Sequence, residues 1–246
     1  MNVEKLTPYS SGESKRVQIT QAFDVLAHRY DLLNRVFSFG IDLLWRRRAL
    51  RLLQKTPPAR LLDVATGTAD LAIMAARRWP RAHIVGLDLS EKMLAIGGAK
   101  AAAAKLDTRI TLRTGDGLAL DFPDASFDAV TAAFGVRNFE NLVAGFSEMR
   151  RVLKPGGRVV ILELSEPQRF PLRRLYAFYL RRVIPRVGTL LTGHAREYVY
   201  LPASIEQVPQ GEAMLDLLRT TGFAGCRCET YTFGICSCYT GQNDLF

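Results

Sequence analysis

Residues 61–70 read Leu61-Leu62-Asp63-Val64-Ala65-Thr66-Gly67-Thr68-Ala69-Asp70. The apolar start of this stretch predicts a buried parallel strand, Gly67 predicts a tight turn, and the pattern over 70–79 predicts a helix. A second short strand is predicted at 83–86, and Asp88 follows it closely. This succession is typical of the mononucleotide-binding half of an open α/β sheet. There, the glycine turn approaches the ligand and the acid after the second strand binds ribose hydroxyls.

The turn lacks the supporting glycines of a dinucleotide fingerprint, because Ala65, Ala69 and Ala72 stand where they are expected. The carboxylate of Asp70 lies where a pyrophosphate would approach, and two negative groups at one helix start repel each other. A ligand that carries a sulfonium and an ammonium group would be attracted instead. The turn therefore favours S-adenosylmethionine over NAD as the cofactor.

Length and composition fit one large α/β domain, residues 1–246. Of the 246 residues, 48% are hydrophobic and 23% are charged, which is ordinary for a soluble globular protein. The sequence has no apolar run of about 18 residues, so no transmembrane helix is expected. Residues 1–16 are polar and lack the apolar core of a signal peptide, so we expect a flexible arm and a cytoplasmic protein.

All four cysteines lie near the C-terminus, as the pairs Cys226 with Cys228 and Cys236 with Cys238. Zinc ligands usually follow a Cys-x₂₋₄-Cys spacing, whereas a period of two places both cysteines of a pair on one face of a strand. Free cysteine is also common in protein cores. The spacing thus favours buried thiols over a metal site or a disulfide.

The formal net charge of +9 invites a nucleic-acid or membrane-surface partner. Basic residues concentrate in two places, Arg46-Arg47-Arg48 with Arg51, and the stretch 169–196. Either cluster could also be an ordinary solvated face. In the second cluster, paired arginines alternate with apolar and aromatic residues at helical spacing, which favours contact with anionic lipid headgroups or the capping of an apolar pocket.

Four segments are predicted along the chain: a helical cap at 16–55, a cofactor-binding core at 59–166, a basic amphipathic insertion at 167–206, and a C-terminal helix and hairpin at 207–246. Within the cap we expect helices at 17–29 and 43–54. The core should contain strands at 60–65, 83–88, 109–114, 127–133 and 157–164, with helices at 70–79, 91–104 and 141–153. The last segment should contain a helix at 209–221 and strands at 223–231 and 233–241. The predicted fold is therefore a mostly parallel seven-stranded sheet closed by an antiparallel hairpin.

Several further stretches are characteristic when taken together: Tyr30-Asp31-Leu32-Leu33-Asn34, Ser38-Phe39-Gly40-Ile41, Asp63 to Leu71, Leu87-Asp88-Leu89-Ser90, Phe134-Gly135-Val136-Arg137-Asn138, Leu153-Lys154-Pro155-Gly156-Gly157 and Leu162-Glu163-Leu164-Ser165. Over residues 20 to 241 the chain resembles the quinone C-methyltransferases of ubiquinone and menaquinone biosynthesis. It departs from that family at Ala69, where a glycine is usual, and at Ala133, where a serine is common.

The resemblance implies a Rossmann-like class I S-adenosylmethionine-dependent methyltransferase. The implied reaction methylates a ring carbon of a polyprenylated hydroquinone. Demethylmenaquinol is favoured over a ubiquinone-precursor benzoquinol. The implied site of action is the inner face of a membrane, to which the protein binds peripherally. The oligomeric state stays open, a homodimer included.

The resemblance also implies the cofactor residues. Gly67 and Thr68 would hold the methionine end of the cofactor, and Asp63 would supply negative charge near its ammonium, together with Asp70 unless that residue only caps its helix. Asp88 would bind the ribose hydroxyls. A further contact with adenine is implied for Asp116 and the backbone of Gly117. The alternative for each acid is a helix cap or a solvated turn.

Carbon methylation requires an electron-rich ring carbon, which a hydroquinone supplies and an oxidised quinone does not. Arg137 and Asn138 are the expected catalytic residues after the fourth strand. A guanidinium stays charged, so Arg137 would stabilise a phenolate rather than accept a proton. Tyr30 and His194 are the further catalytic candidates, although a lone histidine is more often structural. Other polar candidates are Asn34 and Tyr198.

Two other classes of function compete with this interpretation. An RNA or DNA methyltransferase would suit the basic charge, but the stretch Ala132-Ala133-Phe134-Gly135 is unlike the Asn/Asp-Pro-Pro-aromatic motif of enzymes that methylate base amino groups. A protein that binds the cofactor without turnover is the other alternative. For the quinone methyltransferase we further expect a lid, formed by 30–45 and 170–201, whose apolar inner side admits the prenyl tail.

Overall fold

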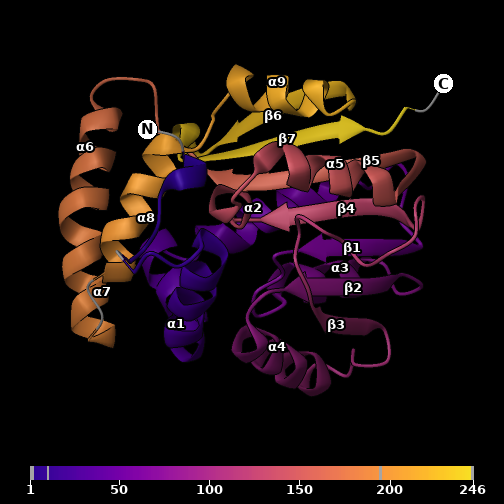
Figure 1. Ribbon diagram of the computed structural model, residues 1–246, viewed down its shortest axis with the longest axis horizontal. Coiled ribbons are helices and arrows are strands. Elements are labelled where there is room, and N and C mark those ends of the chain that lie inside the picture. The colour runs from indigo at the N-terminus through magenta and orange to yellow at the C-terminus, as the bar shows by residue number, and fades with distance from the viewer. Residues whose placement is uncertain (1–2, 10, 194–195, 245–246) are drawn as a thin grey trace.

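A seven-stranded sheet runs through the centre of the computed structural model, which describes residues 3–9, 11–193 and 196–244. The strand order is β3-β2-β1-β4-β5-β7-β6 (Figure 1). The strands are β1 Arg60–Val64, β2 His83–Asp88, β3 Ile110–Thr114, β4 Phe127–Ala133, β5 Leu153–Leu164, β6 Ala224–Tyr231 and β7 Cys236–Gln242. The first five pair in parallel, while β7 runs antiparallel to both β5 and β6. The predicted fold is confirmed, the C-terminal hairpin included.

Both faces of the sheet are covered by helices, because alternate residues of its central strands are apolar on both sides. Helices α2 (Ile41–Arg51) and α3 (Asp70–Arg78) pack on one face, where Leu61, Ile84 and Val160 are buried. The other face carries α5 (Leu142–Val152) and α9 (Glu212–Thr220). Helix α4 (Glu91–Ala103) lies between β2 and β3 in the chain and packs on both strands.

Helix α1 (Lys15–Ser38) is much longer than the helix predicted at 17–29. It begins at Ser14, whose side chain accepts a hydrogen bond from Val17 N. No glycine or proline interrupts it before Phe39 and Gly40, which both adopt positive φ and end the helix. The prediction was wrong because it ended the helix at residue 29, although apolar residues continue at helical spacing through Tyr30, Leu33 and Phe37.

A flexible arm was expected at the start of the chain. This prediction is wrong for residues Val3–Lys5, which form the short helix η1. Val3 is fully buried in the core formed with α5 and β5. Nζ of Lys15 donates to Val3 O at 2.6 Å, and Glu4 accepts a hydrogen bond from Leu142 N at 2.8 Å. These contacts hold the N-terminal segment against the sheet domain.

The basic insertion folds into α6 (Leu172–Phe178), a π-helical turn η3 (Tyr179–Val183), α7 (Ile184–Thr192) and α8 (Arg196–Gln207). Figure 1 shows these helices beside α1, at the end of the molecule towards which the parallel strands point. A small apolar core joins them, with Leu33 of α1 packed among Tyr176, Leu180, Ile184 and Tyr198. Helix α1 and the insertion thus form one layer over the carboxyl ends of the strands, while α2, the other helix of the predicted cap, packs on a face of the sheet.

The two cysteines of each pair share one face of a strand, as their spacing predicts, and the two pairs lie on opposite faces of the hairpin. Cys236 and Cys238 are buried with Trp45 and Tyr231, whereas Cys226 and Cys228 pack towards α9. Among the described residues, no group of three or more histidine, cysteine, aspartate or glutamate side chains could hold a metal ion. In the same part of the chain, no helix is both long and apolar enough to cross a bilayer.

Candidate active site

Two neighbouring cavities open at the carboxyl ends of the parallel strands. We name the first the turn cavity, because it is lined by the loop after β1 and by the ends of β2, β3 and β4. The second, the helical cavity, is enclosed mainly by α1, α2 and α6 to α8, and its volume is about 1080 Å³ counting its open mouth. Residues shared by both linings are Ile19, Phe23, Tyr30, Phe134 and Asn138. The two cavities therefore adjoin at these residues.

In the turn cavity, Asp88 and the glycine turn hold each other in place. One carboxylate oxygen of Asp88 accepts a hydrogen bond from Gly67 N at 2.8 Å and the other accepts one from Ser90 N at 3.0 Å. Gly67 has φ +57°, a conformation that favours glycine. Burial raises the pKa of Asp88, although the backbone N–H groups around it oppose that shift. The arrangement places a hydrogen-bond acceptor at the end of β2, directly beside the turn.

Asp116 and Gly117 lie across the same cavity, after β3. A Cβ atom at Gly117 would come within 2.9 Å of Val64 Cγ1, so this position has no room for a side chain. The carboxylate of Asp116 accepts from Leu118 N at 2.9 Å and pairs with the guanidinium of Arg16 at 3.1 Å. Because Arg16 belongs to the first turn of α1, this ion pair holds the start of α1 against the edge of the cavity.

Asp63 and Thr68 line neither cavity. Asp63 is 1% exposed and accepts hydrogen bonds at 2.7 Å from the hydroxyls of Thr66 and Thr131. Burial raises the pKa of Asp63 to about 6, against the effect of these two hydroxyls. The Thr68 hydroxyl donates to Asp31 at 2.5 Å. Both side chains thus bind other protein groups and support the turn without lining a cavity. Their contact with a cofactor stays a prediction.

Asp70 neither caps α3 nor presents a free negative charge. The N-cap of α3 is Ala69, with no side-chain cap, and the Asp70 carboxylate binds Arg35 at 2.5 Å and Lys100 at 2.6 Å. Burial alone would raise its pKa, but the surrounding cations lower it. Lys100 also pairs with Asp31 at 2.5 Å, so the network ties α1 to α3 and α4.

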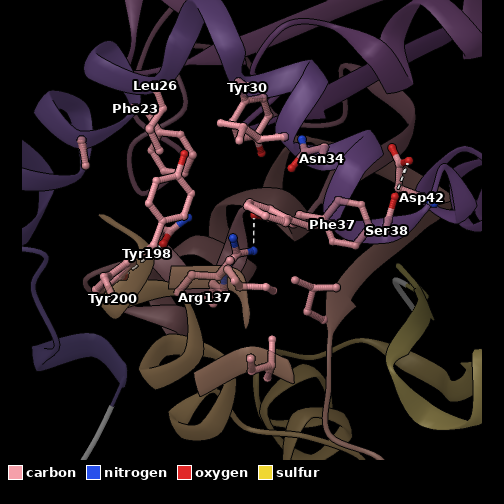
Figure 2. A pocket seen from close by; sticks show the side chains of 18 of the residues that line it. Phe23, Leu26, Tyr30, Asn34, Phe37, Ser38, Asp42, Arg137, Tyr198 and Tyr200 are labelled. Carbon is pink, nitrogen blue, oxygen red and sulfur yellow. Dashed lines mark hydrogen bonds between the residues drawn. The ribbon is translucent and has the colours of Figure 1, made fainter. Parts of the chain in front are cut away.

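The helical cavity is mostly apolar, with a few polar groups on facing walls. Figure 2 shows Tyr30 and Asn34 on α1, facing Arg137 across the cavity. Asn138, beside Arg137 in the short helix η2 (Val136–Asn138), lies in the wall shared with the turn cavity. The structure therefore brings together three of the predicted catalytic residues, Tyr30, Arg137 and Asn138. His194 lies outside the described residues.

Arg137 is held by Glu163 at the end of β5. Its Nη1 donates to Glu163 at 2.7 Å and to the carbonyl of Phe134, and its backbone N donates to Glu163 at 3.2 Å. Both side chains are buried, Arg137 being 6% exposed and Glu163 1%. Burial would lower the pKa of Arg137, but the adjacent Glu163 carboxylate outweighs this and raises it. The guanidinium is thus a permanent cation in an apolar cavity.

Two further residues fix η2, and the sequence analysis missed both. Nζ of Lys15 donates to the carbonyls of Arg137 at 3.2 Å and Phe139 at 3.1 Å, so it holds the backbone on both sides of Asn138. The hydroxyl of Tyr200 on α8 donates to Asn138 Oδ1 at 3.0 Å, and burial raises the pKa of Tyr200, which keeps it a donor.

Comparison with known proteins identifies relatives over nearly the whole chain. The model described as the ubiE/COQ5 methyltransferase family matches residues 10–243. A demethylmenaquinone methyltransferase of Bacteroides fragilis is 44% identical over 237 residues, which cover 96% of this chain and 97% of the relative. A ubiquinone/menaquinone biosynthesis C-methyltransferase UbiE of Geobacter sulfurreducens is 44% identical over 242 residues, covering 98% and 94%.

Solved structures resemble the chain in fold. A SAM-dependent methyltransferase of Thermotoga maritima superposes with a TM-score of 0.64 at 18% identity, covering 91% of this chain and 99% of that one. Phosphoethanolamine N-methyltransferase 2 of Haemonchus contortus, solved with S-adenosyl-L-methionine, gives a TM-score of 0.57 at 18% identity, covering 81% and 53%.

Proposed function

The chain belongs to the ubiE/COQ5 methyltransferase family, and we propose that it transfers a methyl group from S-adenosylmethionine to a ring carbon of a polyprenylated hydroquinone. Demethylmenaquinol is the proposed substrate, and a ubiquinone-precursor benzoquinol is the alternative. The observation that carries the proposal is the common wall, where a cavity suited to a nucleoside meets a deep apolar cavity beside a buried cation.

The residues of the turn cavity fit the proposed cofactor. Asp88 offers a carboxylate to the ribose hydroxyls, and Asp116 offers one to the adenine amino group once Arg16 gives way. The backbone of Gly67 and Gly117 leaves room for close approach of the ligand. When bound, S-adenosylmethionine supplies an electrophilic methyl group on a sulfonium. Its positive charge suits a cavity whose acidic residues Asp88 and Asp116 lie at its floor and rim.

Arg137 suits the acceptor ring, because the ring carbon becomes nucleophilic when an adjacent phenol loses its proton. The buried guanidinium would stabilise that phenolate, and the low polarity of the cavity strengthens their attraction. Glu163 keeps Arg137 charged and oriented, so Arg137 is not the base. Tyr30 and Asn138, in the shared wall, would align the ring with the methyl group, which is the main requirement of such a transfer.

The apolar walls of the helical cavity fit the prenyl tail, and its outer helices fit a membrane surface. Tyr176, Leu180 and Ile184 line the cavity, while Phe170 and Phe178, 75% and 61% exposed, point outward from the same segment. Exposed arginines surround them. We propose that this layer rests on the inner face of the membrane and admits the tail from the bilayer.

The test is label transfer from methyl-labelled S-adenosylmethionine in detergent. The acceptors are reduced demethylmenaquinol, a reduced ubiquinone precursor and the oxidised quinone. We expect transfer to the reduced compounds alone, with demethylmenaquinol the faster. Transfer to neither quinol, with cofactor binding intact, would overturn the proposal. Methylation of RNA, or no turnover with any substrate, would then identify which of the two competing classes applies.

A further inference from the structure

We propose that Asn34 is a specificity-determining residue, whose side-chain amide donates a hydrogen bond to the second ring oxygen of the substrate. This inference rests on the proposed function and deepens it. Arg137 serves the oxygen next to the methylated carbon, and Asn34 serves the oxygen on the opposite edge of the ring. The enzyme would thereby distinguish rings with two hydroxyl groups from rings with one.

The first support is an unpaired donor. Asn34 lies on α1 one helical turn after Tyr30, and its side chain points into the helical cavity (Figure 2). Its Nδ2 is buried and has no hydrogen-bond partner within the described part of the chain. An unpaired buried donor is costly, so a ligand oxygen that accepts from it would be bound more tightly than one that cannot.

The second support is that three neighbouring polar groups, on Ser38, Tyr179 and Asn138, already have protein partners. Ser38, one turn further along α1, donates to Asp42 at 2.8 Å. The hydroxyl of Tyr179 donates to Phe37 O at 3.0 Å, and Asn138 Oδ1 accepts from Tyr200. Of the described nitrogen atoms that are buried without a partner, two belong to residues of this cavity, Asn34 Nδ2 and Arg137 Nε.

The chemistry of these two donors assigns them to different oxygens. They lie on facing walls, one on α1 and one in η2, so a ring between them presents opposite edges to each (Figure 2). A para-dihydroxy ring carries an oxygen on each of those edges. The cationic guanidinium matches the oxygen that ionises, and the neutral amide matches the oxygen that keeps its proton. An amide does not titrate in this range, so Asn34 orients the ring and does not act as its base.

The test compares two ligands on three proteins. The ligands are a short-chain demethylmenaquinol and its analogue without the hydroxyl remote from the methylated carbon. The proteins are wild type, Asn34→Leu, and the control Ser38→Ala, which removes a hydroxyl already paired with Asp42. The missing oxygen changes ring reactivity equally in all three, so the ratio of the two kcat/KM values isolates the contact. Equilibrium binding is measured in parallel by fluorescence of Trp45, which lines the cavity.

We expect wild type and Ser38→Ala to prefer the dihydroxy ligand by about tenfold or more. In Asn34→Leu the preference in binding should fall to about twofold or less. If Asn34→Leu does not fold, Asn34→Ala, which removes the donor and keeps a good helix former in α1, replaces it. An unchanged preference in the folded variant overturns the inference. A different outcome is that the binding preferences are as expected but neither wild type nor the variants transfer a methyl group. That result would overturn the proposed function and leave the role of Asn34 in binding intact.

Discussion

The buried pair of Arg137 and Glu163 sets the electrostatics of the helical cavity. Glu163 accepts from Arg137 Nη1 at 2.7 Å, from Arg137 N at 3.2 Å and from Leu164 N at 2.9 Å. With so many donors, the carboxylate is fixed in position and in turn fixes the guanidinium. A buried ion pair of this kind costs desolvation, so its retention here fits a role in orienting a cation rather than in stability alone.

Glu163→Gln should lower kcat by about tenfold to a hundredfold, because Arg137 loses the charge that holds its guanidinium against the ring oxygen. The affinity for S-adenosylmethionine should change little, since Glu163 does not line the turn cavity. Thermal or chemical unfolding should show a loss of roughly 2–4 kcal/mol, as an unpaired buried charge remains. Steady-state kinetics and cofactor titration separate these effects.

Glu148→Gln is the matched control. Glu148 also pairs with an arginine at 2.7 Å, but the pair with Arg151 lies on α5, is partly exposed and is remote from both cavities. The Glu148→Gln substitution should lower the unfolding free energy by about 1 kcal/mol or less and leave kcat unchanged. Equal kinetic losses in the two variants would mean that Glu163 acts only through stability.

Among individual residues, the sequence predicted those site residues that belong to its recognisable motifs. Arg137, Asn138 and Tyr30 meet in one cavity, as expected. Glu163 had a usable signal, a charged residue directly after the apolar run 159–162, but it entered only as part of a motif. Lys15 and Tyr200 had none, because their contacts with η2 cross more than 60 residues of chain.

Among the elements, α1 contributes most to the site because it runs past both cavities. Ile19, Phe23 and Tyr30 on α1 lie in the common wall. The helix is fixed to the core along its length, by Arg16 at its start and by Asp31 and Arg35 in its second half. Displacing α1 would therefore open both cavities at once, which fits entry of the two ligands from the same side.

Lys15 fastens the start of α1 to η2, and its protonation should appear in the pH dependence of stability. Burial lowers its pKa to about 8, although Glu4 and Glu140 oppose the shift, whereas the unfolded chain should titrate near 10.5. Between these values the unfolded state binds more protons, so unfolding free energy rises with pH. The unfolding free energy of wild type, measured relative to that of Lys15→Met, should therefore rise by on the order of 3 kcal/mol between pH 7.5 and 10.5.

Urea unfolding at several pH values measures this difference. Lys92→Met removes an exposed lysine of α4 instead and is the control, because a solvated ammonium bears no burial cost. If the difference in unfolding free energy between wild type and Lys15→Met does not change with pH, the buried ammonium is not destabilised by its surroundings.

The elements of the core were predictable, because strands and helices alternate there with clear stop signals. Each of the five parallel strands was placed to within a few residues, apart from the earlier start of β5 at Leu153. The continuation of α1 to Ser38 was missed, although Tyr30, Leu33 and Phe37 continue the apolar spacing of the helix and no glycine or proline interrupts it. The packing of α1 against α7 and α8 depends on contacts between distant parts of the chain, which no local pattern encodes.

For the whole molecule, the layer formed by α1 and α6 to α8 divides its residues between an inner and an outer surface. The inner surface lines the helical cavity. On the outer surface the exposed apolar residues include Phe39, Phe170, Leu175, Phe178 and Leu190. Arg173, Arg174 and Arg182 are exposed on the same helices, and Arg181 pairs with Glu206 at 2.7 Å. Apolar side chains beside exposed arginines suit an anionic bilayer better than water.

Replacing Arg173, Arg174 and Arg182 together with glutamine should weaken binding to vesicles containing anionic lipid by on the order of a hundredfold, because each arginine near such a surface contributes about 1 kcal/mol. The control replaces Arg77, Arg78 and Arg81, three exposed arginines just before β2, at the opposite end of the parallel strands. It removes the same charge and should leave most of the affinity. Vesicle sedimentation at rising salt measures both, and wild-type binding should fall steeply with salt. Equal losses in the two variants would mean that net charge alone attracts the protein, and binding that is insensitive both to salt and to these arginines would exclude the proposed membrane face.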